Sequence, residues 1–200
     1  MAYSAFTYLQ LQERFGMTVA SREGLFRETP PYPATPLLRA VLERQAPIAR
    51  DVSTEMARST MIIAPVLAEI REITERQIGV FPGVELNVDR KSGLHGFCDF
   101  LMGRAAAMID LQAPLLAVVE AKKEDITAGI PQCLAAMYAA QIFNERRGHP
   151  VEATFGVVTS GTAWRFLRLR GTSAEIDSDE YYIDHLDKIL GILLHTVTIL

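Results

Sequence analysis

Residues 115–123 read Leu-Leu-Ala-Val-Val-Glu-Ala-Lys-Lys, an apolar run that ends abruptly in charged residues. Such a run, without polar alternation, is typical of a strand that is covered on both faces of a sheet. Because helices must cover those faces, the run predicts an α/β fold with this strand near its centre. Glu120 and Lys122 come at the end of the strand, where a bare carboxylate is costly unless it is paired or binds a metal ion.

The patterns around this strand predict a central mixed sheet of about five strands, flanked by helices. The other strands are expected from alternating apolar residues over 84–88 and 94–103, and over 154–159 and 164–169 around a Ser160-Gly161 turn. Helical spacing predicts helices over 6–15, over 37–44, from the N-cap Ser53 through a kink or break at Pro65, from Gly129 to about Arg147, and over 183–197. The prolines within 28–36 predict an extended connector, and residues 172–180 read as a polar loop.

The chain has 200 residues, which suits a single domain with a real core. Residues 1–50 are expected to form a helical and extended N-terminal extension, and residues 51–200 the main domain. The apolar helix at the C-terminus is expected to pack on the core, with a homodimer contact as the alternative.

The composition bears on partners and location. A net charge of −4 argues against passive coating of DNA, although an enzyme acting on phosphodiesters needs only a local basic rim. Cys98 and Cys133 lie in apolar surroundings and predict buried, reduced thiols. With no secretory signal and no apolar run long enough to span a membrane, a cytoplasmic protein without membrane contact is expected.

Like Glu120, Asp99 is an unusual residue for its position, because it interrupts an otherwise apolar strand. If the strands over 94–103 and 115–122 form an antiparallel hairpin with a turn near 109–110, Asp99 lies opposite Glu120. Two carboxylates about 5 Å apart on one face repel each other. A hard divalent cation removes that repulsion, and carboxylate oxygens suit Mg²⁺. The pair therefore predicts a magnesium site.

Three further residues extend this candidate site. Lys122 points to the same side of the strand as Glu120, where an ammonium can reach a water held between the metal and a phosphate. Gln132 lies in the first turn of the next helix, where an amide can hold a phosphate or the attacking water. Glu55, early in a long helix, is a candidate for a more remote carboxylate or a second metal. Each also has a purely structural interpretation. Glu55 can be a carboxylate that suits the first turn of a helix, Gln132 can bond a loop carbonyl, and Lys122 can form an ion pair with Asp99 or Glu120.

Taken together, Glu55, Asp99, Glu120-x-Lys122 and Gln132 resemble the PD-(D/E)xK nuclease superfamily. The run from Ser53 to Leu67 is similar to the opening helix of the nuclease domains in type I restriction enzyme R subunits. Residues 118–122 resemble the catalytic strand, and residues 132–138 the glutamine-tyrosine helix, with Cys98 in place of the proline that names the motif.

This resemblance covers roughly residues 53–170 and implies a restriction-endonuclease-like core within residues 51–200. It implies Mg²⁺-dependent hydrolysis of phosphodiester bonds, with Mn²⁺ as a substitute ion. The implied metal ligands are Asp99, Glu120 and the Ala121 carbonyl, with Lys122 at the water. DNA is the expected partner, with a separate protein to select the target. The alternative is a catalytically silent module of the same fold that binds nucleic acid or protein.

Overall fold

The computed structural model describes residues 2–105 and 107–198. The helices are α1 (Tyr8–Phe15), α2 (Pro36–Val52), α3 (Glu55–Arg58), α4 (Ala64–Ile73), α5 (Ile130–Arg146) and α6 (Leu186–Thr198). The strands are β1 (Thr18–Arg22), β2 (Ile78–Glu85), β3 (Phe97–Arg104), β4 (Leu115–Ala121), β5 (Thr154–Thr159), β6 (Ala163–Arg170), β7 (Ser173–Asp177) and β8 (Tyr181–Tyr182).

The molecule is an α/β protein with one mixed sheet, as the sequence predicts. Its strands lie in the order β1-β7-β6-β5-β4-β3-β2, and β8 pairs with β6 beside this path. Strand β1 pairs with β7 in parallel, and so does β4 with β5. All other strand pairs in the sheet are antiparallel.

The prediction of about five strands is wrong, because the described part of the chain forms a sheet of eight. Residues 172–180, expected to be a polar loop, contain β7. Its Ala174 and Asp177 are buried although the stretch looks polar. Strand β1 is exposed at every residue, so it carries no alternation that could reveal it.

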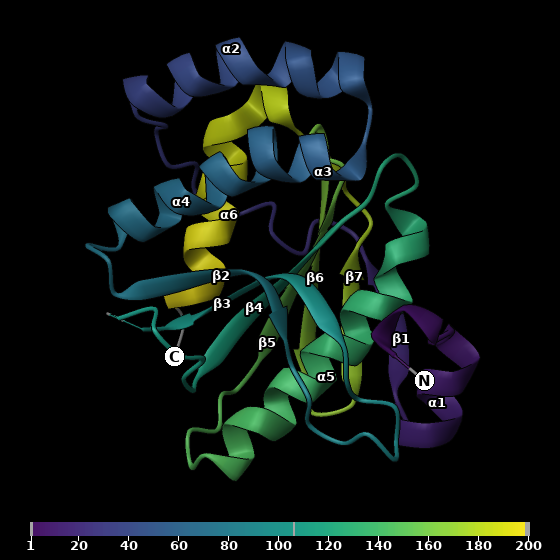
Figure 1. Cartoon of the computed structure of the whole chain (residues 1–200). Helices are drawn as coiled ribbons and strands as arrows, with labels where there is room; N and C mark the ends of the chain where they lie inside the picture. The colour runs from purple at the N-terminus through teal and green to yellow at the C-terminus, as the bar shows by residue number, and fades with distance from the viewer. Residues whose placement is uncertain (1, 106, 199–200) are drawn as a thin grey trace.

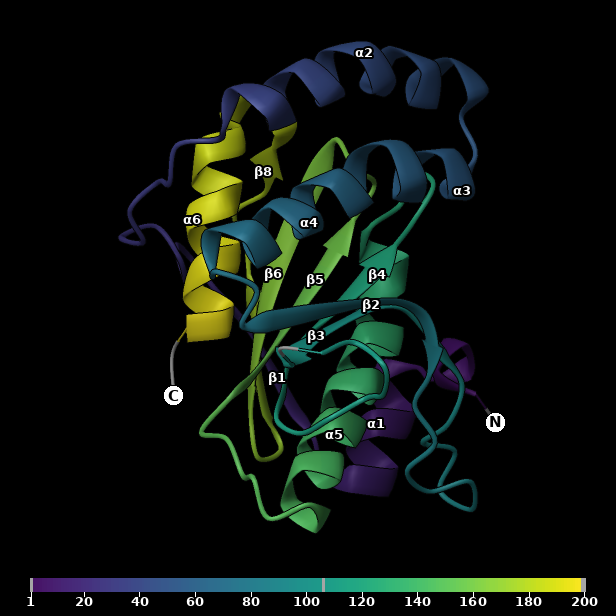
Figure 2. The same ribbon diagram turned by 60° about the vertical axis from the view of Figure 1, so that its left-hand side comes forward.

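Helices cover both faces of the sheet (Figures 1 and 2). One apolar core lies between the sheet and helices α4 and α6, and α2 extends it by packing on α3, α4 and residues 59–63. A second core lies between the sheet and helices α1 and α5. Strand β4 separates the two cores and is buried at every residue. The doubly covered strand predicted from its apolar run is therefore confirmed, as is the packing of α6 on the core. None of the helices in the described residues is long and apolar enough to cross a bilayer.

Two helix boundaries differ from the prediction. Helix α2 continues through the exposed Pro47 to Val52, well beyond the predicted residues 37–44. Ser53, predicted to be an N-cap, ends α2 in the left-handed conformation at φ 51°, and the Oγ1 of Thr54 caps α3 by accepting the Ala57 amide. The long helix then passes through a π-helical segment, Ser59–Ile63, directly before Pro65 in the first turn of α4. This irregular segment accommodates the missing amide of the proline.

The strands that carry the candidate site pair as expected. β3 and β4 are antiparallel, with Phe100 opposite Val119 and Leu101 opposite Val118. Extending this register by one residue places Asp99 opposite Glu120, which is the predicted pairing. The first predicted strand is displaced, since β2 covers residues 78–85 rather than 84–88.

Helix α6 packs so closely on the connector before α2 that Gly191 is required for space. A Cβ at Gly191 would overlap the carbonyl oxygen of Pro30 and lie 3.0 Å from the Pro31 Cα. Because backbone cannot rotate away, Gly191→Ala is expected to destabilise the protein by about 1–3 kcal/mol. Chemical denaturation of this variant and of the exposed control Thr198→Ala tests the contact. Equal stability of Gly191→Ala and the wild type would contradict it.

Candidate active site

The candidate site lies where β4 ends, between the start of β3 and the first turn of α5. Asp99, half-buried on β3, accepts the backbone amide of Ala121 through its Oδ2 at 2.8 Å. This bond ties the Asp99 carboxylate to the end of β4. On the other side, the Lys122 amide donates to the Thr159 carbonyl of β5 at 2.8 Å. The backbone of residues 120–122 is therefore fixed by both neighbouring strands.

Gln132 connects the acidic and basic side chains of the site. Its Nε2 donates to Glu120 Oε2 at 2.6 Å, and its Oε1 accepts from the Lys122 ammonium at 3.3 Å. The ammonium also lies 4.0 Å from Glu120 Oε2. Pro131 at the start of α5 suits the first helical turn, where its missing amide costs nothing. The helix start therefore delivers Gln132 onto the end of β4.

Glu120 is fully buried, at 0% exposure. Burial raises the pKa of this carboxyl well above its ordinary value of 4.5, and the negative charge of Asp99 raises it further. Lys122 acts in the opposite direction, and the charge of Glu55 adds a smaller increase. Desolvation is therefore the largest influence on the Glu120 pKa, and it outweighs the opposing charge of Lys122.

The structure brings four of the predicted residues together: Asp99, Glu120, Lys122 and Gln132. Glu55 is less closely involved. It is exposed in the first turn of α3 and is close enough to influence the Glu120 pKa. Within the described residues it forms no hydrogen bond or ion pair with the other four.

The oxygens of the carboxylate pair fit a hard cation. Glu120 Oε1 is buried and has no hydrogen-bond partner in the described structure, an arrangement that costs free energy unless something binds it. Across residues 2–105 and 107–198, no group of three or more His, Cys, Asp or Glu side chains is arranged to hold a metal ion. The predicted set differs from such a group, since it combines two carboxylates, from Asp99 and Glu120, with the Ala121 carbonyl. It stays a prediction.

Three residues near the site were not anticipated from the sequence. Tyr3 is buried, and its pKa is raised by burial and by the charges of Cys98 and Glu120. Arg58 of α3 donates from Nη1 to the Ser160 carbonyl at the end of β5, at 3.0 Å. Gly129 lies against the stem of Lys122. The sequence offers little signal for Tyr3, which is far from the site along the chain.

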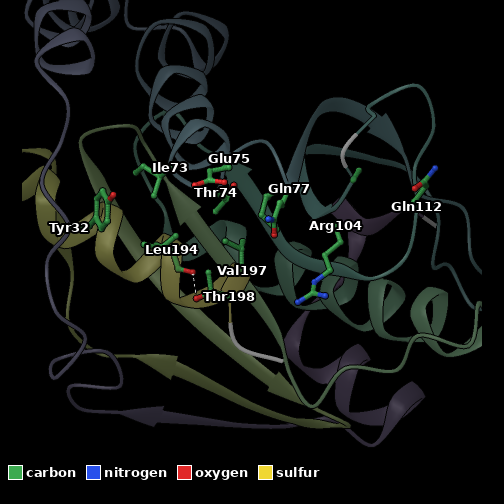
Figure 3. Close-up of a pocket in the computed structure, with 12 residues that line it drawn as sticks. Tyr32, Ile73, Thr74, Glu75, Gln77, Arg104, Gln112, Leu194, Val197 and Thr198 are labelled. Atoms are coloured by element: carbon green, nitrogen blue, oxygen red, sulfur yellow. Dashed lines mark hydrogen bonds between the residues drawn. The ribbon is translucent and has the colours of Figure 1, made fainter.

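A separate cavity of about 750 Å³ opens elsewhere on the molecule, near the ends of α4 and α6 and the outer end of β3 (Figure 3). Residues of mixed character line it, among them Tyr32, Ile73, Gln77, Arg104 and Leu194. None of the predicted site residues lines this cavity. Its described lining residues include one carboxylate, Glu75, and no lysine.

The chain was also compared with known proteins. No protein-family model matches the sequence, and no curated protein matches it significantly.

The buried Glu120 predicts a specific dependence of stability on pH. Because its folded-state pKa is raised, its favourable contribution is complete below pH 4.5 and is lost as pH rises through the raised pKa. Over that range the wild type should lose about 1.4 kcal/mol per pH unit relative to Glu120→Gln. Denaturation in EDTA between pH 5 and 9 measures the difference, with the exposed Glu124→Gln as the matched control. A pH-independent difference between Glu120→Gln and the wild type would contradict this description of the site.

Proposed function

We propose that the chain is a Mg²⁺-dependent nuclease that hydrolyses phosphodiester bonds of DNA on a restriction-endonuclease-like core. The observation that carries the proposal is the convergence of Asp99, Glu120 and Lys122 at the end of one buried strand, where Glu120 Oε1 has no partner among the described residues. The resemblance of the sequence to PD-(D/E)xK nucleases supports the same reaction. The antiparallel β3–β4 pair followed by parallel β5 is consistent with it.

Each residue has a distinct role in this proposal. Asp99 and Glu120 would hold the ion, with the Ala121 carbonyl as a third ligand, and the bound ion would activate water and polarise the phosphate. Lys122 would donate hydrogen bonds to the attacking water or to a phosphoryl oxygen, where its positive charge stabilises the negative charge of the transition state. Gln132 would keep the Lys122 ammonium and the Glu120 carboxyl aligned while the substrate binds.

The net charge of the chain bears on how it would contact DNA. A net charge of −4 makes broad electrostatic attachment to DNA weak, so contacts with the backbone would be local to the site. We therefore propose that a separate protein supplies target selection. A homodimer would be a second way to enlarge the contact with DNA.

A second candidate function is a catalytically silent module of the same fold. The observation that favours it is the contact between Gln132 Nε2 and Glu120 Oε2, because the protein's own amide occupies an oxygen of the fully buried carboxyl. Such a module would bind nucleic acid or protein without metal-dependent cleavage.

Incubation with supercoiled plasmid, single-stranded DNA or RNA, in Mg²⁺, Mn²⁺ or EDTA, separates the two functions. Cleavage that EDTA abolishes supports the nuclease, whereas binding without cleavage supports the silent module.

Lys122 gives the most direct mutational test of the chemistry. Lys122→Ala removes the charge beside the reacting groups and is expected to lower turnover on plasmid DNA by about 10²–10³-fold. The matched control is Lys123→Ala, since Lys123 is an exposed neighbour whose ammonium lies 3.9 Å from the exposed Glu124 carboxylate. Melting curves establish that both variants fold. A Lys122→Ala protein that cleaves at the wild-type rate would remove this residue from the mechanism.

Asp99 tests metal binding separately from turnover. Asp99→Asn keeps the shape of the side chain but removes one negative charge from the pair, so Mg²⁺ and Mn²⁺ affinity should fall about tenfold or more. Isothermal titration calorimetry measures it without any substrate, with Asp110→Asn on the exposed loop as the control. Unchanged affinity in Asp99→Asn would place the ion elsewhere.

A further inference from the structure

Gly129 is a buried glycine where the backbone does not call for one. It lies at the end of the short 3₁₀ turn Thr127–Gly129 and directly precedes α5. Its φ of −81° and ψ of −13° are in the right-handed region, which any L-residue can adopt. The absence of a side chain must therefore have another reason.

Space is that reason. A Cβ on Gly129 would lie 2.8 Å from Lys122 Cε, 3.0 Å from Lys122 Cγ and 2.7 Å from Val158 Cγ1. Distances below 3.0 Å are essentially never found for a real Cβ, so an alanine would force its neighbours to move. The middle of the Lys122 side chain thus passes through space that only a glycine leaves free.

We propose that Gly129 is a positioning residue for Lys122. The first turn of α5 and the residue before it hold the lysine at two places. Gly129 lets its stem run close to the backbone, and Gln132 Oε1 accepts a hydrogen bond from its ammonium at 3.3 Å. Along this course the stem brings the ammonium to 4.0 Å from Glu120 Oε2. The catalytic meaning of this placement rests on the proposed nuclease function, whereas the placement itself does not.

The test begins with Gly129→Ala in the full chain. The added methyl group displaces the Lys122 stem, and a displacement of about 1 Å at a reacting group can lower turnover on the order of 10²-fold. We expect kcat for plasmid cleavage to fall by this amount while KM for DNA stays within about twofold, because the lysine acts on the transition state. A wild-type kcat in Gly129→Ala would overturn the proposal.

Two companion variants separate positioning from general packing. Gly129→Ala combined with Val158→Ala relieves the contact with Val158 but leaves the contact with Lys122. It should recover part of any lost thermal stability and remain slow. Gly191→Ala on α6 overlaps the Pro30 carbonyl within the core on the other face of the sheet. It should lose stability and keep the wild-type kcat. Full recovery of kcat in the double variant, or an equal loss of kcat in Gly191→Ala, would show that packing alone is responsible.

A structural readout keeps this inference distinct from the proposed function. In a crystal structure of Gly129→Ala, the distance between Lys122 Nζ and Gln132 Oε1 should exceed hydrogen-bonding range. If the wild type cleaves nothing, the proposed function fails and this distance still decides whether Gly129 positions the lysine. An ammonium that keeps its hydrogen bond to Gln132 in the variant would overturn the proposal whatever the activity.

Discussion

The structure depends on one costly feature, a carboxyl group that is fully buried at the end of the central strand. Within residues 2–105 and 107–198, one Glu120 oxygen is hydrogen-bonded and the other has no partner, and the Lys122 ammonium lies 4.0 Å away. Protein folds tolerate such a group only where surrounding elements fix it. Here β3 supplies Asp99 and α5 supplies Gln132, so two packing interfaces meet at one carboxyl. A bound divalent cation would complete this arrangement by neutralising both acids.

Part of this arrangement could be predicted because it depends on short-range rules. The apolar run before Glu120 identifies a doubly covered strand, and the hairpin register with Phe100 opposite Val119 follows from counting residues across a turn. Alternation along the strand then puts Lys122 on the side of Glu120. The position of Gln132 follows from the first helical turn after the strand. These relations require only strand and helix periodicity.

The remainder depends on long-range contacts that a single sequence does not reveal. The sequence of β7 looks like a polar loop, since it contains Asp177. This aspartate is nevertheless buried, because its carboxylate accepts hydrogen bonds from the distant Leu25 and Phe26 amides. Strand β1 is exposed and pairs with β7 in parallel, so neither alternation nor a hairpin turn indicates it. The same reason hides Gly129, whose importance comes from a lysine stem in three dimensions rather than from any local backbone strain.

The central claim is that Asp99 and Glu120 share a divalent cation, and anomalous diffraction tests it most directly. Crystals grown with Mn²⁺ should show an anomalous peak between the two carboxylates, at about 2.0–2.3 Å from an oxygen of each. Glu120 Oε1, which has no hydrogen-bond partner in the part of the chain that the structure describes, should be one of the ligands. At saturating Mn²⁺, a map with no peak there, and with Gln132 still bonded to an unliganded Glu120, would contradict the account.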